Sequence, residues 1–181
     1  MVKRNILILV VSCFVVIWIG RIYSINQVTP ISTFFHIGEH VDCGDIELLF
    51  VESHLDNPEV FNNRFNVDCD IDTDDEYKLI SICIEVTNTS DNDIGWDSIF
   101  QFLDYGFEST VWASSINTTL GASINRLNSE CLSPGQSQRL WFIAKVQKTC
   151  FKETSWNSIN DYQFYYVLST NPSKVAVILE V

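Results

Sequence analysis

The sequence predicts an all-β protein: an antiparallel, immunoglobulin-like β-sandwich of about seven strands, preceded by one N-terminal transmembrane helix. Short apolar stretches with a period of two are separated by turn residues roughly every 8–15 residues, which is typical of a sandwich. After Ser24 no long apolar stripe recurs at helical spacing. An apolar run from Ile6 to Gly20, with Lys3 and Arg4 before it, predicts the helix.

The N-terminal apolar run is short for a membrane span. Its 15 residues would form a helix about 22 Å long, whereas the bilayer core is about 30 Å thick. Adding Ile22 and Tyr23, and letting Lys3 and Arg21 snorkel, makes a span feasible. A cleaved signal peptide has the same outline, although no small-residue cleavage site follows the run. Lipidation at Cys13 is a third alternative, but apolar residues follow that cysteine.

The basic residues before the run place the N-terminus in the cytoplasm and the remainder outside the cell membrane. We therefore expect a single-pass membrane protein with a signal-anchor at 1–24, a linker at 25–35 and an extracytoplasmic domain at 36–181. The chain length suits one domain with its own core. The membrane is then one partner, contacted through the N-terminal helix.

The charge of the expected domain excludes a nucleic-acid partner. All 23 acidic residues lie at Glu39 or later, whereas 3 of the 11 basic residues precede residue 25. From residue 25 onward 8 basic residues face 23 acidic ones, a balance of -15. Binding to phosphates depends on basic side chains, so we expect neither nucleic acid nor anionic headgroups to bind this domain.

Alternation and turn residues locate the expected strands. In the stretch 77–87, Ile80, Ile82, Ile84 and Val86 fall on one face, which predicts a strand with one buried face. Further strands are expected at 46–52, 99–103, 107–113, 139–146, 164–168 and 174–181, with a weaker one at 116–125. The stretches 99–103 and 107–113 should pair as a hairpin, as should the last two strands. A short helix or an irregular loop is expected at 148–160.

Three short motifs resemble a known family. They are Ile37–Val41 followed by Gly44–Leu48, Ile84–Asp91, and Ser133–Gln136 running into Leu140–Phe142. In order and spacing, residues 35–181 resemble bacterial exported proteins that carry an N-terminal anchor or lipid and an immunoglobulin-like (telokin-like) domain of unknown function. The resemblance implies the fold and the location, and it brings no catalytic residues.

The chain departs from that family pattern in two ways. It has five cysteines beyond Cys13, and it carries an insertion at 56–76. Any function particular to this chain is expected there.

The densest acidic stretch lies inside this insertion. Asp68, Asp70, Asp72 and Asp74 occupy alternate positions, and carboxylates so placed could surround a calcium ion. The EF-hand pattern is not met, because Thr73 stands where its glycine belongs when the loop begins at Asp68. A solvated acidic loop that discourages edge aggregation is one alternative, and a surface for a basic protein partner is another.

A second candidate metal site is formed by His36, His40 and Cys43. Imidazole and thiolate ligands suit zinc or copper. Gly38 and Gly44 favour a hairpin, in which residues four apart lie about 13 Å apart, so a site would require the chain to bend. Ordinary histidines at a strand edge are the alternative.

Export would favour disulfides among the cysteines. Five cysteines lie beyond Cys13, so one of them stays free or pairs between chains. Sequence does not determine the connectivity. The pair we prefer is Cys131 with Cys150, because these residues flank one expected strand and its entry loop.

The sequence favours a binding role over catalysis. No nucleophile elbow, metalloprotease helix or phosphate-binding loop is present. Trp141 should face away from the core side of its strand, either as a contact for a protein or glycan partner or beneath a loop. We expect a membrane-tethered binding or interaction module without a cofactor. A calcium, zinc or copper module is the alternative, and a hydrolase comes third.

Overall fold

The computed structural model describes residues 18, 32–68, 76–127, 129–170 and 173–181. It divides into two compact units, Met1–Ile31 and Ser32–Val181. Within the described ranges, no helix combines the length and the apolar character needed to cross a membrane. The expected membrane segment at 1–24 lies outside the described residues apart from Trp18, so the transmembrane helix stays a prediction.

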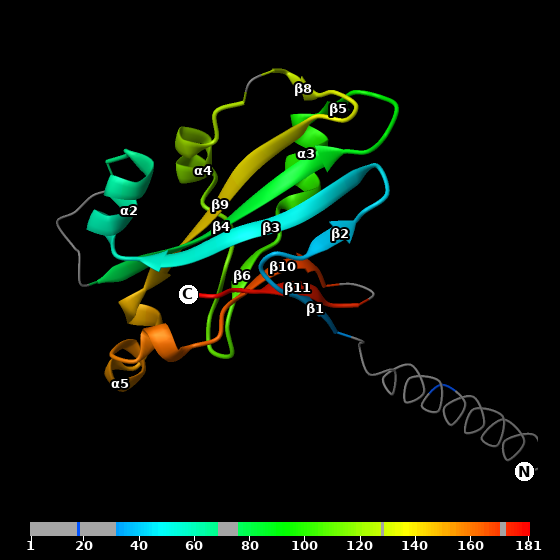
Figure 1. The fold of residues 1–181 in the computed structure, drawn as a ribbon. Coiled ribbons are helices and arrows are strands. Elements are labelled where there is room, and N and C mark those ends of the chain that lie inside the picture. Colours follow the sequence, from blue (N-terminus) through cyan, green and yellow to red (C-terminus); the bar gives the residue numbers. More distant parts are fainter. Residues whose placement is uncertain (1–17, 19–31, 69–75, 128, 171–172) are drawn as a thin grey trace, which may run out of the picture. The chain divides into compact units, whose positions relative to one another are not determined.

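One sheet of the second unit has four antiparallel strands in the order β2-β3-β4-β9 (Figure 1). The strands are β2 (His40–Asp42), β3 (Ile46–Asp56), β4 (Tyr77–Asn88) and β9 (Ser137–Gln147). The inward residues of β4 and β9 are buried, as their alternation predicts; examples are Ile80, Ile84, Leu140 and Phe142. The expected strands at 46–52, 77–87 and 139–146 are therefore confirmed.

The other sheet has five strands in the order β1-β11-β10-β6-β7. They are β1 (Thr33–Phe35), β6 (Gly106–Glu108), β7 (Ala113–Ser114), β10 (Tyr165–Ser169) and β11 (Val175–Ile178). β10 and β11 form the expected C-terminal hairpin. β1 runs parallel to β11, an exception to the antiparallel expectation. Strand pairing thus begins at Thr33, inside the stretch expected to be a linker.

The two sheets pack face to face as a β-sandwich (Figure 1). Side chains from both sheets fill a single core, among them Leu48, Phe50, Ile82, Tyr166 and Val177. A short ribbon of β5 (Ile94–Gly95) and β8 (Cys131–Leu132) stands apart from both sheets. The described ranges contain eleven strands where about seven were expected, because six of them are only two or three residues long.

The expected strand at 99–103 is wrong, because these residues belong to the helix α3 (Trp96–Leu103). Trp96, Ile99 and Leu103 are buried and recur at helical spacing, so one apolar stripe faces the core. The expected hairpin between this stretch and 107–113 is therefore wrong as well. β6 pairs with β7 and β10 instead.

The weaker strand expected at 116–125 is also wrong, because the helix α4 (Thr118–Ile124) occupies it. The Asn117 side chain accepts a hydrogen bond from the Leu120 backbone and caps this helix. Asn57 caps α2 (Pro58–Phe65) in the same way. The stretch 148–160 is helical or irregular, as expected: it contains η1 (Lys148–Cys150), α5 (Glu153–Trp156) and the start of η2 (Ile159–Asp161).

Helices α2 and α4 cover the outer face of the four-stranded sheet, opposite the core. Phe61 of α2 is buried against that face, in a cluster with Tyr77, Leu79 and Ile143 to which α4 also contributes. β4 is consequently buried on both faces: Ser81 is 0% exposed and Cys83 1% exposed. The expectation of one buried face is wrong here: α2 and α4 pack over Tyr77 and Leu79 on the other face, and Cys83 lies beside Trp141 of β9.

Candidate functional site

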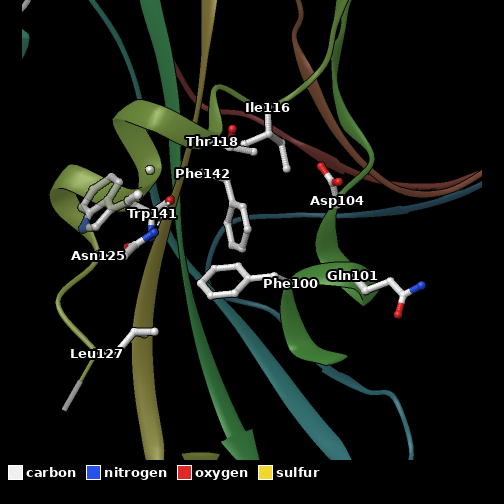
Figure 2. A pocket seen from close by; sticks show the side chains of 11 residues that line it. Phe100, Gln101, Asp104, Ile116, Thr118, Asn125, Leu127, Trp141 and Phe142 are labelled. Carbon is white, nitrogen blue, oxygen red and sulfur yellow. Dashed lines mark hydrogen bonds between the residues drawn. The ribbon is translucent and has the colours of Figure 1, made fainter. Parts of the chain in front are cut away.

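A pocket opens beside β9, which is an edge strand of the four-stranded sheet. It has a volume of about 390 Å³ and lies between α3, α4 and β9 (Figure 2). Most of the lining is apolar or small. The lining residues are Phe100, Gln101, Asp104, Ile116, Thr118, Gly121, Ala122, Asn125, Leu127, Trp141 and Phe142.

The floor of the pocket is aromatic and continuous with the core. Phe100 of α3 and Phe142 of β9 meet edge to face, with ring centroids 6.3 Å apart and planes at 67°. Phe142 also contacts Tyr166 of the opposite sheet, at 5.5 Å between centroids. Aromatic pairs with this spacing are mutually stabilising, so the floor is held from both sides.

Two asparagines hold α4 against the edge of β9 and form one wall. The Asn117 backbone N–H donates to the Ile143 carbonyl at 2.6 Å. Asn125 Nδ2 donates to the Trp141 carbonyl at 2.9 Å, and Asn125 Oδ1 accepts from the Trp141 N–H at 2.7 Å. The Asn125 side-chain amide thus makes the two backbone hydrogen bonds that a neighbouring strand would otherwise make to Trp141. An edge strand leaves such backbone groups unpaired unless something covers them.

Small residues on α4 leave the space open. Gly121 and Ala122 face the pocket and carry at most a methyl group. Leu127 stands at the rim and is 39% exposed. Protein interiors are normally filled to crystal-like density, so an apolar cavity of this size beside packed aromatic rings is a feature that a ligand can use.

Asp104 is the charged residue of the lining. It is the C-cap residue of α3 and it is exposed. In the described part of the chain its side chain forms neither a hydrogen bond nor an ion pair with another residue. No histidine, cysteine, lysine or arginine is among the described residues that line the pocket. The site therefore offers apolar contact, one carboxylate, and the hydroxyl and amide groups of Thr118, Gln101 and Asn125.

Tyr166 lies beneath this site and is fully buried. Its hydroxyl donates a hydrogen bond to the Leu103 carbonyl at the end of α3. Burial raises the pKa of Tyr166 well above its ordinary value, and the nearby negative charge of Asp104 raises it further. The hydroxyl therefore stays protonated and keeps the end of α3 fixed to β10.

Most of the expected calcium site lies outside the described residues. Asp70, Asp72 and Asp74 are not described, and Asp68 is exposed at the edge of the gap. Calcium binding by this stretch stays a prediction. The described residues hold no cluster of three or more metal-ligating side chains.

The structure does not bring His36, His40 and Cys43 together as a metal site. The exposed His40 pairs through Nδ1 with Glu47 at 2.8 Å. Cys43 is half-buried, and burial followed by the charge of Asp42 raises the pKa of its thiol. A raised thiol pKa disfavours the thiolate that a metal needs.

The preferred disulfide between Cys131 and Cys150 is not present: both residues are free thiols. Cys131 lies in β8, before β9 begins, and Cys150 lies in η1, after β9 ends. The 11 residues of β9 separate the two cysteines by roughly 36 Å, far beyond the reach of a disulfide. Flanking one strand in sequence places two residues at its opposite ends.

Trp141 faces away from the core side of β9, as its alternation predicts, and is half-buried. Phe65 of α2 meets its ring edge-on, with centroids 4.7 Å apart, and His54 stacks on it at 6.0 Å. Of the pocket-lining residues, Trp141 alone is expected from the sequence. The others were missed because α3 and α4 were expected to be strands, although the spacing of Trp96, Ile99 and Leu103 indicates a helix.

Two solved structures resemble this fold. An uncharacterized β-sandwich protein from Clostridium difficile 630 aligns with a TM-score of 0.53 at 12% identity, covering 85% of this chain and 98% of that protein. A conserved hypothetical protein from Bacillus anthracis aligns with a TM-score of 0.51 at 11% identity, covering 78% and 94% respectively. No protein-family model and no curated protein match the sequence. These likenesses show a β-sandwich shared with uncharacterized bacterial proteins.

Proposed function

We propose that the chain is a non-catalytic binding module, in which the pocket beside β9 receives an apolar group of the ligand. One observation carries the proposal: a cavity of about 390 Å³ with an aromatic floor remains open at the surface of a well-packed sandwich. Small-molecule sites commonly have volumes of about 300–1,000 Å³ and mostly apolar linings with a few polar groups. This lining has that composition.

The rigidity of the site supports a binding role. Phe142 is anchored in the core, and Trp141 is held through both of its edge-facing backbone groups by Asn125. A preorganised pocket loses little conformational entropy when a ligand enters. Because Gly121 and Ala122 face the cavity, no large side chain has to move out first.

The proposal places the module outside the cell membrane. Its basis is the order of basic and apolar residues at the N-terminus, with Lys3 and Arg4 before the run from Ile6 to Gly20. The resemblance to exported telokin-like domains supports the same location and the immunoglobulin-like subtype. The partner that carries the apolar group is then a protein or glycan conjugate, or a free molecule, at the cell surface.

Binding of indole to the full chain tests the proposal. The chain is labelled with 5-fluorotryptophan and held in nanodiscs of zwitterionic lipid, and indole is titrated while ¹⁹F spectra are recorded. We expect the Trp141 resonance, assigned with a Trp141→Phe variant, to shift in a saturable way. The other four tryptophans serve as internal references.

A pair of variants on α4 provides the control. Ala122→Phe should fill the cavity and abolish the shift of Trp141, whereas Ala122→Ser should leave it in place. A Trp141 resonance that does not respond to indole, or that responds equally in Ala122→Phe, would contradict binding in this pocket.

A further inference from the structure

We propose that the ligand of this pocket is a cationic amphiphile, an apolar group that carries a positively charged nitrogen, with Asp104 as the residue that pairs with the cation. This inference rests on the proposed binding function and specifies the chemistry of its ligand. It starts from the composition of the lining, in which one carboxylate stands among apolar and neutral residues.

The placement of Asp104 is unfavourable for the helix that carries it. The carbonyl groups at the C-terminus of a helix bear a partial negative charge, which favours basic rather than acidic residues there. α3 has no basic residue in its last turn, and Asp104 is its C-cap. A residue that opposes a local rule without a compensating contact marks a position where another role is served.

The carboxylate is available to a ligand. Asp104 stands beside the pocket together with Gln101, across from Asn125, and Figure 2 shows the Gln101 amide pointing outward. Among the described residues Asp104 has no hydrogen-bond or ion-pair partner, while both polar atoms of Asn125 are engaged by Trp141. A bound cation would therefore face the Asp104 carboxylate and the carbonyl end of α3 together.

The surroundings select the sign of the charge. Residues 89–139, which include α3 and α4, contain six acidic residues against the two basic residues Arg126 and Arg139, and Arg139 is already paired with Glu85. Arg126 does not belong to the lining. The Asp104 carboxylate and the carbonyl end of α3 both bear negative charge beside the pocket, so an anionic ligand would meet repulsion there.

Three indole compounds with different charges separate these effects. Tryptamine is a cation at pH 7, tryptophol is neutral, and indole-3-propionate is an anion, while the apolar group is the same. With the full chain in zwitterionic nanodiscs and the Trp141 ¹⁹F resonance as the readout, we expect tryptamine to bind about tenfold more tightly than tryptophol. Indole-3-propionate should bind most weakly, and added salt should reduce the differences.

Asp104→Asn and Asp97→Asn form a matched pair of variants. Both remove one exposed carboxylate from α3, but Asp97 does not line the pocket. In Asp104→Asn, tryptamine should bind no more tightly than tryptophol does to the same variant. Asp97→Asn should keep most of the preference. The ¹⁹F resonances of the other tryptophans report whether each variant is folded.

The outcomes distinguish this inference from the proposed function. If tryptophol and tryptamine shift Trp141 with equal affinity, the pocket binds apolar groups and the assignment of a cationic ligand is overturned. The same holds if the preference for tryptamine survives in Asp104→Asn. If none of the three compounds shifts Trp141, the proposed function itself fails.

Discussion

Helices α2 and α4 both cover the outer face of the same sheet, yet α2 seals it and α4 leaves a pocket. α2 inserts Phe61, which is 0% exposed, and Phe65, whose ring contacts both Phe61 and Trp141 at 4.7 Å between centroids. α4 presents Gly121 and Ala122 at the pocket and is held by backbone and amide hydrogen bonds. The difference shows that a covering helix can be attached by buried aromatic rings, or by hydrogen bonds together with half-buried aliphatic residues, and that the second way leaves room for a ligand.

The largest expected effect tests the packing of the two helices directly. Phe61→Ala should lower the free energy of unfolding by about 3–5 kcal/mol, because it removes a fully buried ring and leaves a cavity. Leu120→Ala on α4 should cost about 1–2 kcal/mol, since Leu120 is only half-buried. Urea unfolding of both variants measures the contrast. Equal losses would show that α4 is packed as tightly as α2.

A smaller effect is expected where polar contacts attach α4. Asn125→Ala leaves the Trp141 N–H and carbonyl without partners and should lower the free energy of unfolding by about 1–3 kcal/mol. With this edge uncovered, the Trp141 amide proton should also exchange faster with water, and the protein should aggregate more readily. Hydrogen exchange followed by mass spectrometry measures the exchange rate at Trp141. The exposed Asn160→Ala is the control, and a similar result for both variants would argue against the role of Asn125.

The smallest expected effect concerns the Cys83 thiol and tests whether water reaches the outer face of β4. Burial, followed by the charges of Glu52 and Glu85, raises the pKa of Cys83 to about 12, with Arg139 acting in the opposite direction. Above pH 9 the unfolded chain loses this thiol proton and the native chain keeps it, so stability is full below pH 9 and falls as pH rises toward 12. Between pH 8 and 9.5 this group should contribute a fall of about 0.8 kcal/mol.

Cys83→Val removes the titrating thiol, so the free energy of unfolding should fall by about 0.8 kcal/mol less between pH 8 and 9.5 than in the unmodified chain. Urea unfolding at the two pH values provides the measurement, with Cys150→Val at an exposed cysteine as the control. A decline of the same size in Cys83→Val and in the unmodified chain would mean that water reaches Cys83.

The sequence predicts the sheets better than the helices that build the site. In β4 and β9 the alternation of residues such as Ile82 and Phe142 is long and regular, so strand and inward face follow from it. In α3 the helical spacing spans only Trp96, Ile99 and Leu103, and aromatic residues in a short stretch equally suggest a strand. α4 has no long apolar stripe, and its position depends on contacts with β9 that no local pattern encodes.

The pocket and the cysteines show what depends on tertiary structure. The cavity exists because Gly121 and Ala122 happen to face Trp141 across a strand edge, which only the assembled fold determines. The distance between Cys131 and Cys150 likewise follows from the full extension of β9. Calcium binding by Asp68 and the rest of the acidic stretch stays a prediction from the sequence.

Because of β1, the first strand after residue 31, the domain should yield to mechanical force in more than one step. β1 is joined to β11 by a ladder of three residue pairs, and Thr33 and Phe34 are exposed. Tension that enters from the N-terminal side reaches β1 before any other strand. This short ladder should part first, lengthening the chain by about 10 Å while the sandwich core and the pocket beside β9 remain intact.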